Sequence, residues 1–331
     1  MSAEAKLEVG TLTVSASPHI RCDESVAKIM WTVNLALAPA AIFSIYNFGL
    51  PAFKTMFICI AAALITEYAI LKWQRKAIVL NDGSAFLTGL LLAMNIPATV
   101  PWYIPLCGTV VAIGIAKHTM GGLGYNIFNP ALIGRAFLLA SWPIAMTTWP
   151  TITSKVDSVS SATPLGILKL QGYDKLVQFF GEKSDMYQAM FLGTRGGSMG
   201  ETSALLLIAG GVYLIYRKYI NWQIPVLMIG TVGLLTWMFG GSSGLFSGDA
   251  LLHMMSGGLI LGAFFMATDM VTIPITIKGQ IIFAIGAGAL TVLIRLLGGY
   301  PEGVCYAILL MNSVTPLIDR LIKPAKYGAG R

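Results

Sequence analysis

Residues 157–163 read D-S-V-S-S-A-T and lie in the longest polar interval of the chain. On either side the sequence is almost entirely apolar, in runs long enough to cross a lipid bilayer. A Ser/Thr-rich segment between such runs must be held at the membrane surface, because lipid offers no partners to its backbone polar groups. Surface segments of this kind usually carry the chemistry of a protein. The pattern therefore predicts membrane helices organised around one polar segment outside the bilayer.

The composition indicates an all-α integral membrane protein. Of 331 residues, 56% are hydrophobic and only 11% are charged, whereas soluble domains carry roughly a quarter charged residues. The net charge of +7 is spread between hydrophobic runs without an aromatic-interleaved basic patch, so it indicates membrane orientation and no nucleic-acid partner. The cysteines are isolated along the chain, at Cys22, Cys59, Cys107 and Cys305. Their spacing favours neither a disulfide framework nor a C-x-x-C metal site, and the sequence identifies no metal ligands.

The apolar runs give about ten candidate spans of about 20 residues, five before the polar interval and five after it. The first group comprises residues 26–48, 53–73, 83–97, 101–119 and 128–147, and the second comprises 203–219, 222–240, 249–270, 277–297 and 300–318. Several are short or interrupted by Pro and Gly. Glu67, inside the second span, is a candidate for an ion path or a bound flavin, because intramembrane acids are often functional.

The basic residues between these spans alternate, which predicts the orientation of the chain. One side carries Lys72, Arg75, Lys76, Lys117, Arg217, Lys218, Lys278 and the basic residues of the C-terminal tail, and Lys54 is the visible exception on the other side. We therefore expect residues 1–25 and 319–331 to be cytoplasmic and residues 148–202 to form an external loop. Residues 26–147 and 203–318 would be two five-helix membrane units.

The two membrane units look like diverged copies of each other. Gly121-Gly122 followed by Asn129-Pro130 parallels Gly298-Gly299 followed by Thr315-Pro316. With five spans in each copy, the second must cross the membrane in the opposite sense, which is a common way to build transporter-like folds. The sequence thus predicts two inverted five-helix repeats.

Residues 121–135, G-G-L-G-Y-N-I-F-N-P-A-L-I-G-R, predict a broken helix at membrane depth. Backbone groups freed by such a break are tolerated only around a cavity, a cofactor or an ion, and the side chains of Asn126 and Asn129 are candidate ligands there. The alternative is that the glycines allow close packing and that Asn129-Pro130 begins the next helix. A matching break around Met266-Ala267-Thr268-Asp269 carries an acidic group.

Residues 157–163 resemble the flavin-attachment motif of the family that includes the D subunit of the Rnf complex and the B subunit of the Na+-translocating NADH:quinone reductase. In that family the final Thr carries FMN through a phosphoester, so the resemblance implies covalent FMN on Thr163. Asp157, Ser160, Ser161 and Ala162 would be the peptide that a flavin transferase recognises, although many members have Gly at the position of Ser161. The alternative is an ordinary Ser/Thr turn leading into Pro164.

The resemblance extends to residues 121–135 and to Ser17-Pro18-His19-Ile20-Arg21, and the short N-terminal extension is more similar to the Rnf member. It implies a fold like that of urea and ammonium channels, riboflavin within the membrane, and a cell membrane of bacteria or archaea. Its implied partners are the other Rnf proteins, a flavin transferase and Na+ or H+. The phosphate of the implied ester could pair with Lys155 or Lys169.

The expected function is electron carriage in an ion-translocating ferredoxin:NAD+ oxidoreductase. The chain is not catalytic alone, because it has no dinucleotide-binding fold and no cysteine cluster for iron–sulfur ligation. Two alternatives stay open, since fold does not determine function. They are the corresponding subunit of a Na+-translocating NADH:quinone reductase and a passive urea- or ammonium-like channel.

Overall fold

The computed structural model describes residues 24–149, 163–193, 196–201, 203–241 and 244–324. Throughout these ranges the regular structure is helical, without a strand. The sequence features at Ser17–Arg21 and at Lys155, Asp157, Ser160, Ser161 and Ala162 lie outside the described residues, so the structure bears on none of them.

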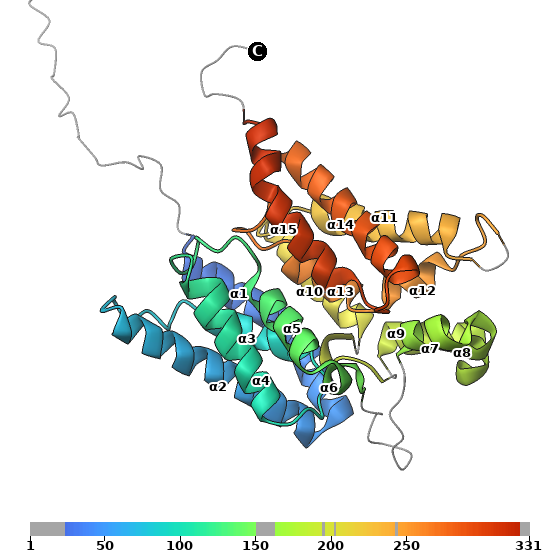
Figure 1. The fold of residues 1–331 in the computed structure, drawn as a ribbon, viewed down its shortest axis with the longest axis horizontal. Coiled ribbons are helices and arrows are strands. Elements are labelled where there is room, and N and C mark those ends of the chain that lie inside the picture. Colours follow the sequence, from blue (N-terminus) through green and yellow to red (C-terminus); the bar gives the residue numbers. More distant parts are fainter. Residues whose placement is uncertain (1–23, 150–162, 194–195, 202, 242–243, 325–331) are drawn as a thin grey trace, which may run out of the picture.

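The helices form two groups that lie side by side in Figure 1. The N-terminal group contains α1 (Val26–Phe48), α2 (Leu50–Trp73), α3 (Ser84–Met94), α4 (Tyr103–Val111) continued by the π-helical turns η1 (Ala112–His118), α5 (Pro130–Ser141) and α6 (Pro143–Thr147). The C-terminal group contains α10 (Ala204–Tyr216), α11 (Gln223–Phe239), α12 (Ala250–Met255), α13 (Leu259–Leu261), the π-helical η3 (Gly262–Met266), α14 (Ile277–Leu297) and α15 (Val304–Leu321).

The long helices have the length and composition of membrane spans. Among the described residues, α1, α2, α14 and α15 are each long and apolar enough to cross a membrane, and α3, α4 with η1, α5, α10 and α11 are shorter apolar helices. Helix α14 has the bounds 277–297 that the sequence predicts. The chain is therefore a multi-pass, all-helical membrane protein.

Both groups are interrupted where the sequence predicts a broken helix. In the N-terminal group, η1 ends at His118 and α5 begins only at Pro130. In the C-terminal group, η3 ends at Met266 and α14 begins at Ile277. Single π-helical turns are rare and are frequent at functional sites. These interruptions are therefore the natural places to look for a site.

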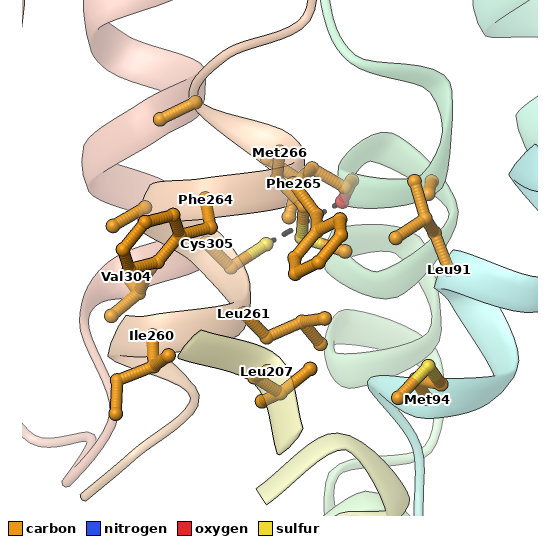
Figure 2. Packing of buried hydrophobic residues seen from close by; sticks show 14 of the residues in the cluster. Leu91, Met94, Leu207, Ile260, Leu261, Phe264, Phe265, Met266, Val304 and Cys305 are labelled. Carbon is orange, nitrogen blue, oxygen red and sulfur yellow. Dashed lines mark hydrogen bonds between the residues drawn. The ribbon is translucent and has the colours of Figure 1, made fainter. Parts of the chain in front are cut away.

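The core lies where the two groups meet, and Figure 2 shows this packing. Leu91 and Met94 of α3 belong to the same buried apolar cluster as Leu207 of α10, Leu261 of α13 and Phe265 of η3. In a bilayer, such contacts stabilise mainly through close packing rather than through removal of apolar surface from water. The shape of the interface therefore matters more than its hydrophobicity.

Small residues bring α1 and α10 into close contact. A Cβ atom at Gly210 would overlap the backbone oxygen of Ala36, and one at Gly211 would overlap the ring of Phe264. Both separations would be far below van der Waals contact, so only glycine fits these positions while the helices keep their spacing.

Residues 164–193, which the sequence assigns to a loop, contain three short helices instead. They are α7 (Pro164–Gln171), α8 (Tyr173–Phe180) and α9 (Lys183–Leu192), which we call the three-helix segment. Ile167, Leu176, Met186 and Met190 form its small core together with Leu252 of α12. In Figure 1 the segment lies at one edge of the molecule. Leu252 therefore anchors this segment to the C-terminal group.

We expect Gly210→Ala to destabilise the protein by about 1–3 kcal/mol, because the added methyl group forces α1 and α10 apart. Gly230→Ala is the matched control, since nothing lies within 4 Å of a Cβ atom at that position of α11. The control should be neutral or slightly stabilising, because alanine is the better helix former. Thermal unfolding in detergent measures both variants. Equal stability of the two variants would contradict this account of the α1–α10 contact.

Candidate functional site

Thr163 begins α7 and serves as its N-cap. Its backbone is extended (φ −62, ψ 154), its hydroxyl oxygen accepts a hydrogen bond from the backbone N–H of Gly166 at 3.2 Å, and Pro164 occupies the first helical position. This is the Ser/Thr turn into proline that the sequence offers as an alternative, and it holds the hydroxyl in one place. The Thr163 residue is only 3% exposed.

A cavity of about 310 Å³ lies beside this hydroxyl, and we call it the Thr163 cavity. Its walls come from α5, α6, α7, α15 and the connection before α15. They include three aromatic side chains, Trp149, Tyr300 and Tyr306, together with three charged ones, Arg135, Lys169 and Glu302. Mostly apolar and aromatic walls with a few convergent polar groups are typical of cofactor sites.

Lys169, a candidate phosphate partner from the sequence, is already engaged. Its ammonium group donates to the backbone oxygens of Arg295 at 3.1 Å, of Tyr300 at 3.4 Å, and of Gly298. An ammonium group has three donors, so the lysine acts as a cationic cap for the C-terminal end of α14. It connects α7 to α14.

Arg135 is the charged group at the inner wall of the Thr163 cavity. One guanidinium nitrogen, Nη2, donates to the carboxylate of Glu302, and the other, Nη1, donates to Oδ1 of Asn95 at 2.8 Å. Arg135 comes from α5, Asn95 follows α3, and Glu302 precedes α15. The arginine therefore bridges the N-terminal and C-terminal groups. It belongs to the stretch 121–135, yet sequence reasoning gave it no role, although an arginine in an apolar run was a usable signal.

Polar contacts continue from Arg135 to the two interruptions. Nδ2 of Asn95 donates to the oxygen of Leu91 at 2.7 Å and lies 3.5 Å from the sulfur of Met266. The backbone oxygen of Met266 accepts from Nδ2 of Asn129 at 3.3 Å. Glu302, Arg135, Asn95, Met266 and Asn129 thus form a continuous chain of contacts, which we call the polar chain. Sequence patterns gave no sign of it, because its members are far apart along the chain.

A second cavity, of about 90 Å³, lies at the other end of the polar chain, and we call it the Asn126 cavity. Asn126 and Asn129 from the first interruption line it together with Thr268 and Asp269 from the second. The side chain of Asn126 donates to the oxygen of Phe128 at 3.2 Å and interacts with the carboxylate of Asp269. The two breaks that the sequence predicts therefore meet at one site.

Asn129 has a structural role at this site. Its Oδ1 accepts from the backbone N–H groups of Ala131 at 3.0 Å and Leu132 at 3.4 Å, so it is the N-cap of α5. Its Nδ2 donates a hydrogen bond to the backbone oxygen of Met266. The capping role that the sequence offers as the alternative is observed for Asn129, whereas the side-chain oxygen of Asn126 has no such backbone role.

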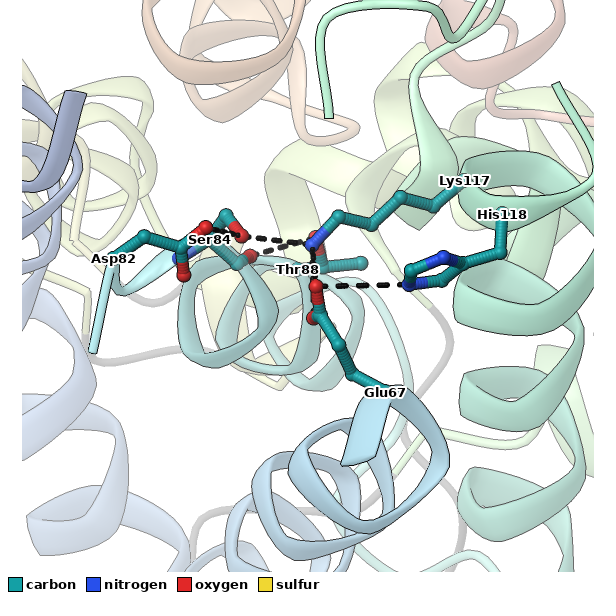
Figure 3. A network of polar contacts seen from close by, with 6 residues as sticks. All are labelled: Glu67, Asp82, Ser84, Thr88, Lys117 and His118. Carbon is teal, nitrogen blue, oxygen red and sulfur yellow. Dashed lines mark hydrogen bonds and ion pairs between the residues drawn. The ribbon is translucent and has the colours of Figure 1, made fainter. Parts of the chain in front are cut away.

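Lys117, which lines the Asn126 cavity, forms a buried ion pair with Glu67 (Figure 3). Nζ of Lys117 is 2.7 and 2.8 Å from the two carboxylate oxygens of Glu67 and donates to Oγ of Ser84 at 2.7 Å. His118 Nε2 lies 3.6 Å from the same carboxylate. The side chain of Lys117 is 2% exposed. Lys117, which the sequence counts among the basic residues of one membrane side, is therefore held inside the protein by Glu67 and does not face solvent.

The three-helix segment is attached to the C-terminal group through Asp249. Oδ2 of Asp249 accepts from the hydroxyl groups of Tyr173 at 2.8 Å and Tyr187 at 2.5 Å. Burial, and then the hydrogen bond to this carboxylate, raise the pKa of both tyrosines, so both stay neutral donors at physiological pH.

Among the described residues, no three His, Cys, Asp or Glu side chains are grouped so that they could hold a metal ion.

Comparison with known proteins identifies the family of this chain. Residues 13–328 match the model of the NQR2, RnfD, RnfE family. This chain belongs to that family. The D subunit of the proton-translocating ferredoxin:NAD(+) oxidoreductase complex of Clostridium ljungdahlii is 65% identical, over 99% of this chain and 100% of the relative.

More distant relatives are similar over almost the same length. The D subunit of the Na(+)-translocating ferredoxin:NAD(+) oxidoreductase complex of Acetobacterium woodii is 48% identical over 96% of this chain and 95% of the relative. The D subunit of the ion-translocating oxidoreductase complex of Stutzerimonas stutzeri is 42% identical over 92% of each chain. The family resemblance that the sequence motifs indicate is therefore confirmed over nearly the whole chain.

We expect Glu67→Leu to destabilise the protein by about 3–5 kcal/mol, because it leaves a buried ammonium group without its counter-ion. Glu67→Leu combined with Lys117→Met should cost less than the single Glu67→Leu change, since the apolar pair leaves no buried charge. Unfolding in mixed detergent micelles measures these differences.

The matched control is Lys28→Gln, which breaks the exposed Glu24–Lys28 pair, with its 2.9 Å contact, and leaves the hydrogen bond from Tyr219 to Glu24 in place. That change should have little effect, because exposed ion pairs are screened by water. A double variant less stable than Glu67→Leu alone would show that the ion pair is not the reason these charges are tolerated.

Proposed function

We propose that this chain is the membrane electron-carrier subunit of an ion-translocating ferredoxin:NAD+ oxidoreductase complex, with FMN joined to Thr163 by a phosphoester. The observation that carries the proposal is the Thr163 hydroxyl at the wall of a cavity with aromatic and charged walls. Relatives matched along nearly their full length are named as the D subunits of such complexes. The chain conducts electrons within the complex, and the chemistry of ferredoxin and NAD+ belongs to other subunits.

The residues around Thr163 fit a flavin. The hydroxyl can form the phosphoester, and Trp149, Tyr300 and Tyr306 offer aromatic faces to a planar ring. The Arg135–Glu302 pair supplies polar groups that can orient a cofactor. When bound, the flavin supplies one-electron and two-electron transfer, which amino-acid side chains lack. Because Thr163 is almost fully buried, a flavin transferase reaches it only while the start of α7 is open.

We propose that the non-covalent riboflavin binds at the Asn126 cavity, which at about 90 Å³ must widen to admit it. Phe264, Phe265 and Tyr219 provide apolar and aromatic walls, and Asn126 and Thr268 provide polar groups that orient a ring system. The polar chain connects this site to the Thr163 cavity through packed, hydrogen-bonded groups. These contacts support the proposal that the two flavin sites are connected through the core.

The proposed topology has ten membrane crossings in two inverted repeats, urea- and ammonium-channel-like, with both termini cytoplasmic and the three-helix segment outside. A similarity between the two halves supports it. Lys117, near the end of η1, donates to Ser84 at the start of α3. Arg295, near the end of α14, donates to the backbone oxygens of His253 at 2.6 Å and Ser256 at 2.8 Å, just before α13. Each half thus places a buried cation from near the end of one helix against a neighbouring helix end, at the start of α3 in one half and at the end of α12 in the other.

The translocated cation is Na+ or H+. The relatives from Clostridium ljungdahlii and Acetobacterium woodii are named for different ions, so overall identity does not separate the two cases. The quinone-reductase alternative is less well supported, since these relatives are named for ferredoxin:NAD(+) oxidoreductase complexes. A passive channel does not account for the Thr163 cavity and its aromatic walls.

Thr163→Val should abolish covalent flavin while membrane insertion persists, because the ester needs the hydroxyl. Thr163→Ser keeps the hydroxyl and should retain part of the attachment. In-gel flavin fluorescence after denaturation, with intact-mass measurement, follows the adduct in a chain co-expressed with a flavin transferase. A wild-type chain without a flavin mononucleotide adduct on the Thr163 peptide would exclude the covalent electron carrier and favour the channel alternative.

Asn126→Leu should reduce the non-covalent flavin content several-fold and leave the covalent flavin on Thr163 unchanged, because it alters only the Asn126 cavity. Asn129→Leu should instead lower stability by about 1 kcal/mol or more, since it removes the N-cap of α5. Flavin extraction with acid, followed by chromatography, separates riboflavin from protein-bound FMN. Full riboflavin content in Asn126→Leu would place the non-covalent flavin elsewhere.

A further inference from the structure

Asp249 makes two different kinds of contact with its two carboxylate oxygens. Oδ1 accepts from the backbone N–H of Leu252 at 3.0 Å and so caps the N-terminus of α12. Oδ2 accepts from both Tyr173 and Tyr187 of the three-helix segment. One ionised side chain therefore joins the segment that follows Thr163 to the beginning of the interrupted helix in the C-terminal group.

The tyrosine side of this joint is held firmly. Tyr173 is the first residue of α8 and Tyr187 lies in α9, so two helices converge on the same oxygen. The ammonium group of Lys183 lies over the ring of Tyr173 at 5.1 Å. Hydrogen bonds from hydroxyl groups to a carboxylate are about twice as strong as neutral ones. The segment is thus fixed in position and not merely packed.

The helix side of the joint leads along the chain towards the centre of the membrane region. Gly257 and Gly258, both with positive φ, separate α12 from α13 and η3. At the end of η3, the backbone oxygen of Met266 is bound by Asn129 and its sulfur lies against Asn95. Leu252 of α12 also packs in the core of the three-helix segment. That segment is therefore joined directly to α12, and the chain from α12 leads through the glycine pair to the Asn126 cavity.

We propose that Asp249 is a positioning residue that couples the three-helix segment to the interrupted helix, so that electron transfer at Thr163 and cation translocation by the complex depend on each other. The proposal rests on the proposed function in that Thr163 bears the flavin. Coupling of this kind requires an element that responds to both sites as one body. Asp249 meets this requirement because its two oxygens bind the two elements at the same time.

The test removes the tyrosine donors and leaves the cap of α12 intact. In Tyr173→Phe with Tyr187→Phe, Oδ1 of Asp249 still caps α12, whereas Oδ2 loses both partners. We expect hydrogen exchange of α8 and α9 to accelerate by about tenfold or more, since two hydrogen bonds to a charged group are lost. Covalent flavin should stay at the wild-type level.

The decisive readout is the number of cations moved per electron, measured with the complete complex in proteoliposomes. We expect this ratio to fall by at least half in the double variant while electron transfer continues. Tyr216→Phe, at an exposed position of α10, is the matched control and should leave both hydrogen exchange and the ratio unchanged. The single variants Tyr173→Phe and Tyr187→Phe should give intermediate ratios. They replace the double variant in this test if the double variant does not fold.

Each outcome decides the proposal. Faster exchange of α8 and α9 with an unchanged ratio would overturn it, because the joint would then be only structural. Unchanged exchange would also overturn it, because the contacts would not hold the segment. Absence of covalent flavin in the wild-type chain would contradict the proposed function instead, and the exchange measurement on the joint would still stand.

Discussion

The side chain of Asn129 satisfies the backbone at both interruptions, and the rest of the structure depends on this contact. A broken helix at membrane depth leaves N–H and C=O groups that lipid cannot bind, at a cost of several kcal/mol for each group. Oδ1 of Asn129 binds the first N–H groups of α5, and its Nδ2 binds the carbonyl at the end of η3. The two interruptions are thus tolerated because Asn129 gives the freed backbone groups at both of them hydrogen-bond partners.

Buried charges follow the same principle of mutual compensation. Arg135 faces Glu302, Lys117 faces Glu67, and Arg295 and Lys169 bind backbone oxygens at the ends of helices. A single charge in this environment is strongly unfavourable, whereas a hydrogen-bonded pair is close to neutral in its effect on stability. The role of these charged groups is better explained by the helices that they hold in position than by a contribution to the stability of the fold. They hold α3, α5, α14 and the connections between helices in one arrangement around the two cavities.

The arrangement separates two tasks that an electron carrier of this kind must combine. The Thr163 cavity lies next to the three-helix segment, and the proposed covalent flavin belongs there. The Asn126 cavity lies between the interruptions, and the proposed riboflavin belongs there. The polar chain and the Asp249 contacts connect them by two routes, one through the core and one along the edge of the molecule.

The sequence by itself determined the membrane class, the helical character and both interruptions, because hydropathy and helix breaking are local properties that depend on neighbouring residues alone. The family, too, followed from short motifs. Only the tertiary structure decided that Asn129 is a cap, that Lys117 is buried against Glu67, and that residues 164–193 fold into helices around Leu252. Arg135, Asn95 and Glu302 meet only in the folded chain. Their contacts join residues separated by 40 to 167 positions, and such pairings depend on how helices pack, which no local pattern encodes.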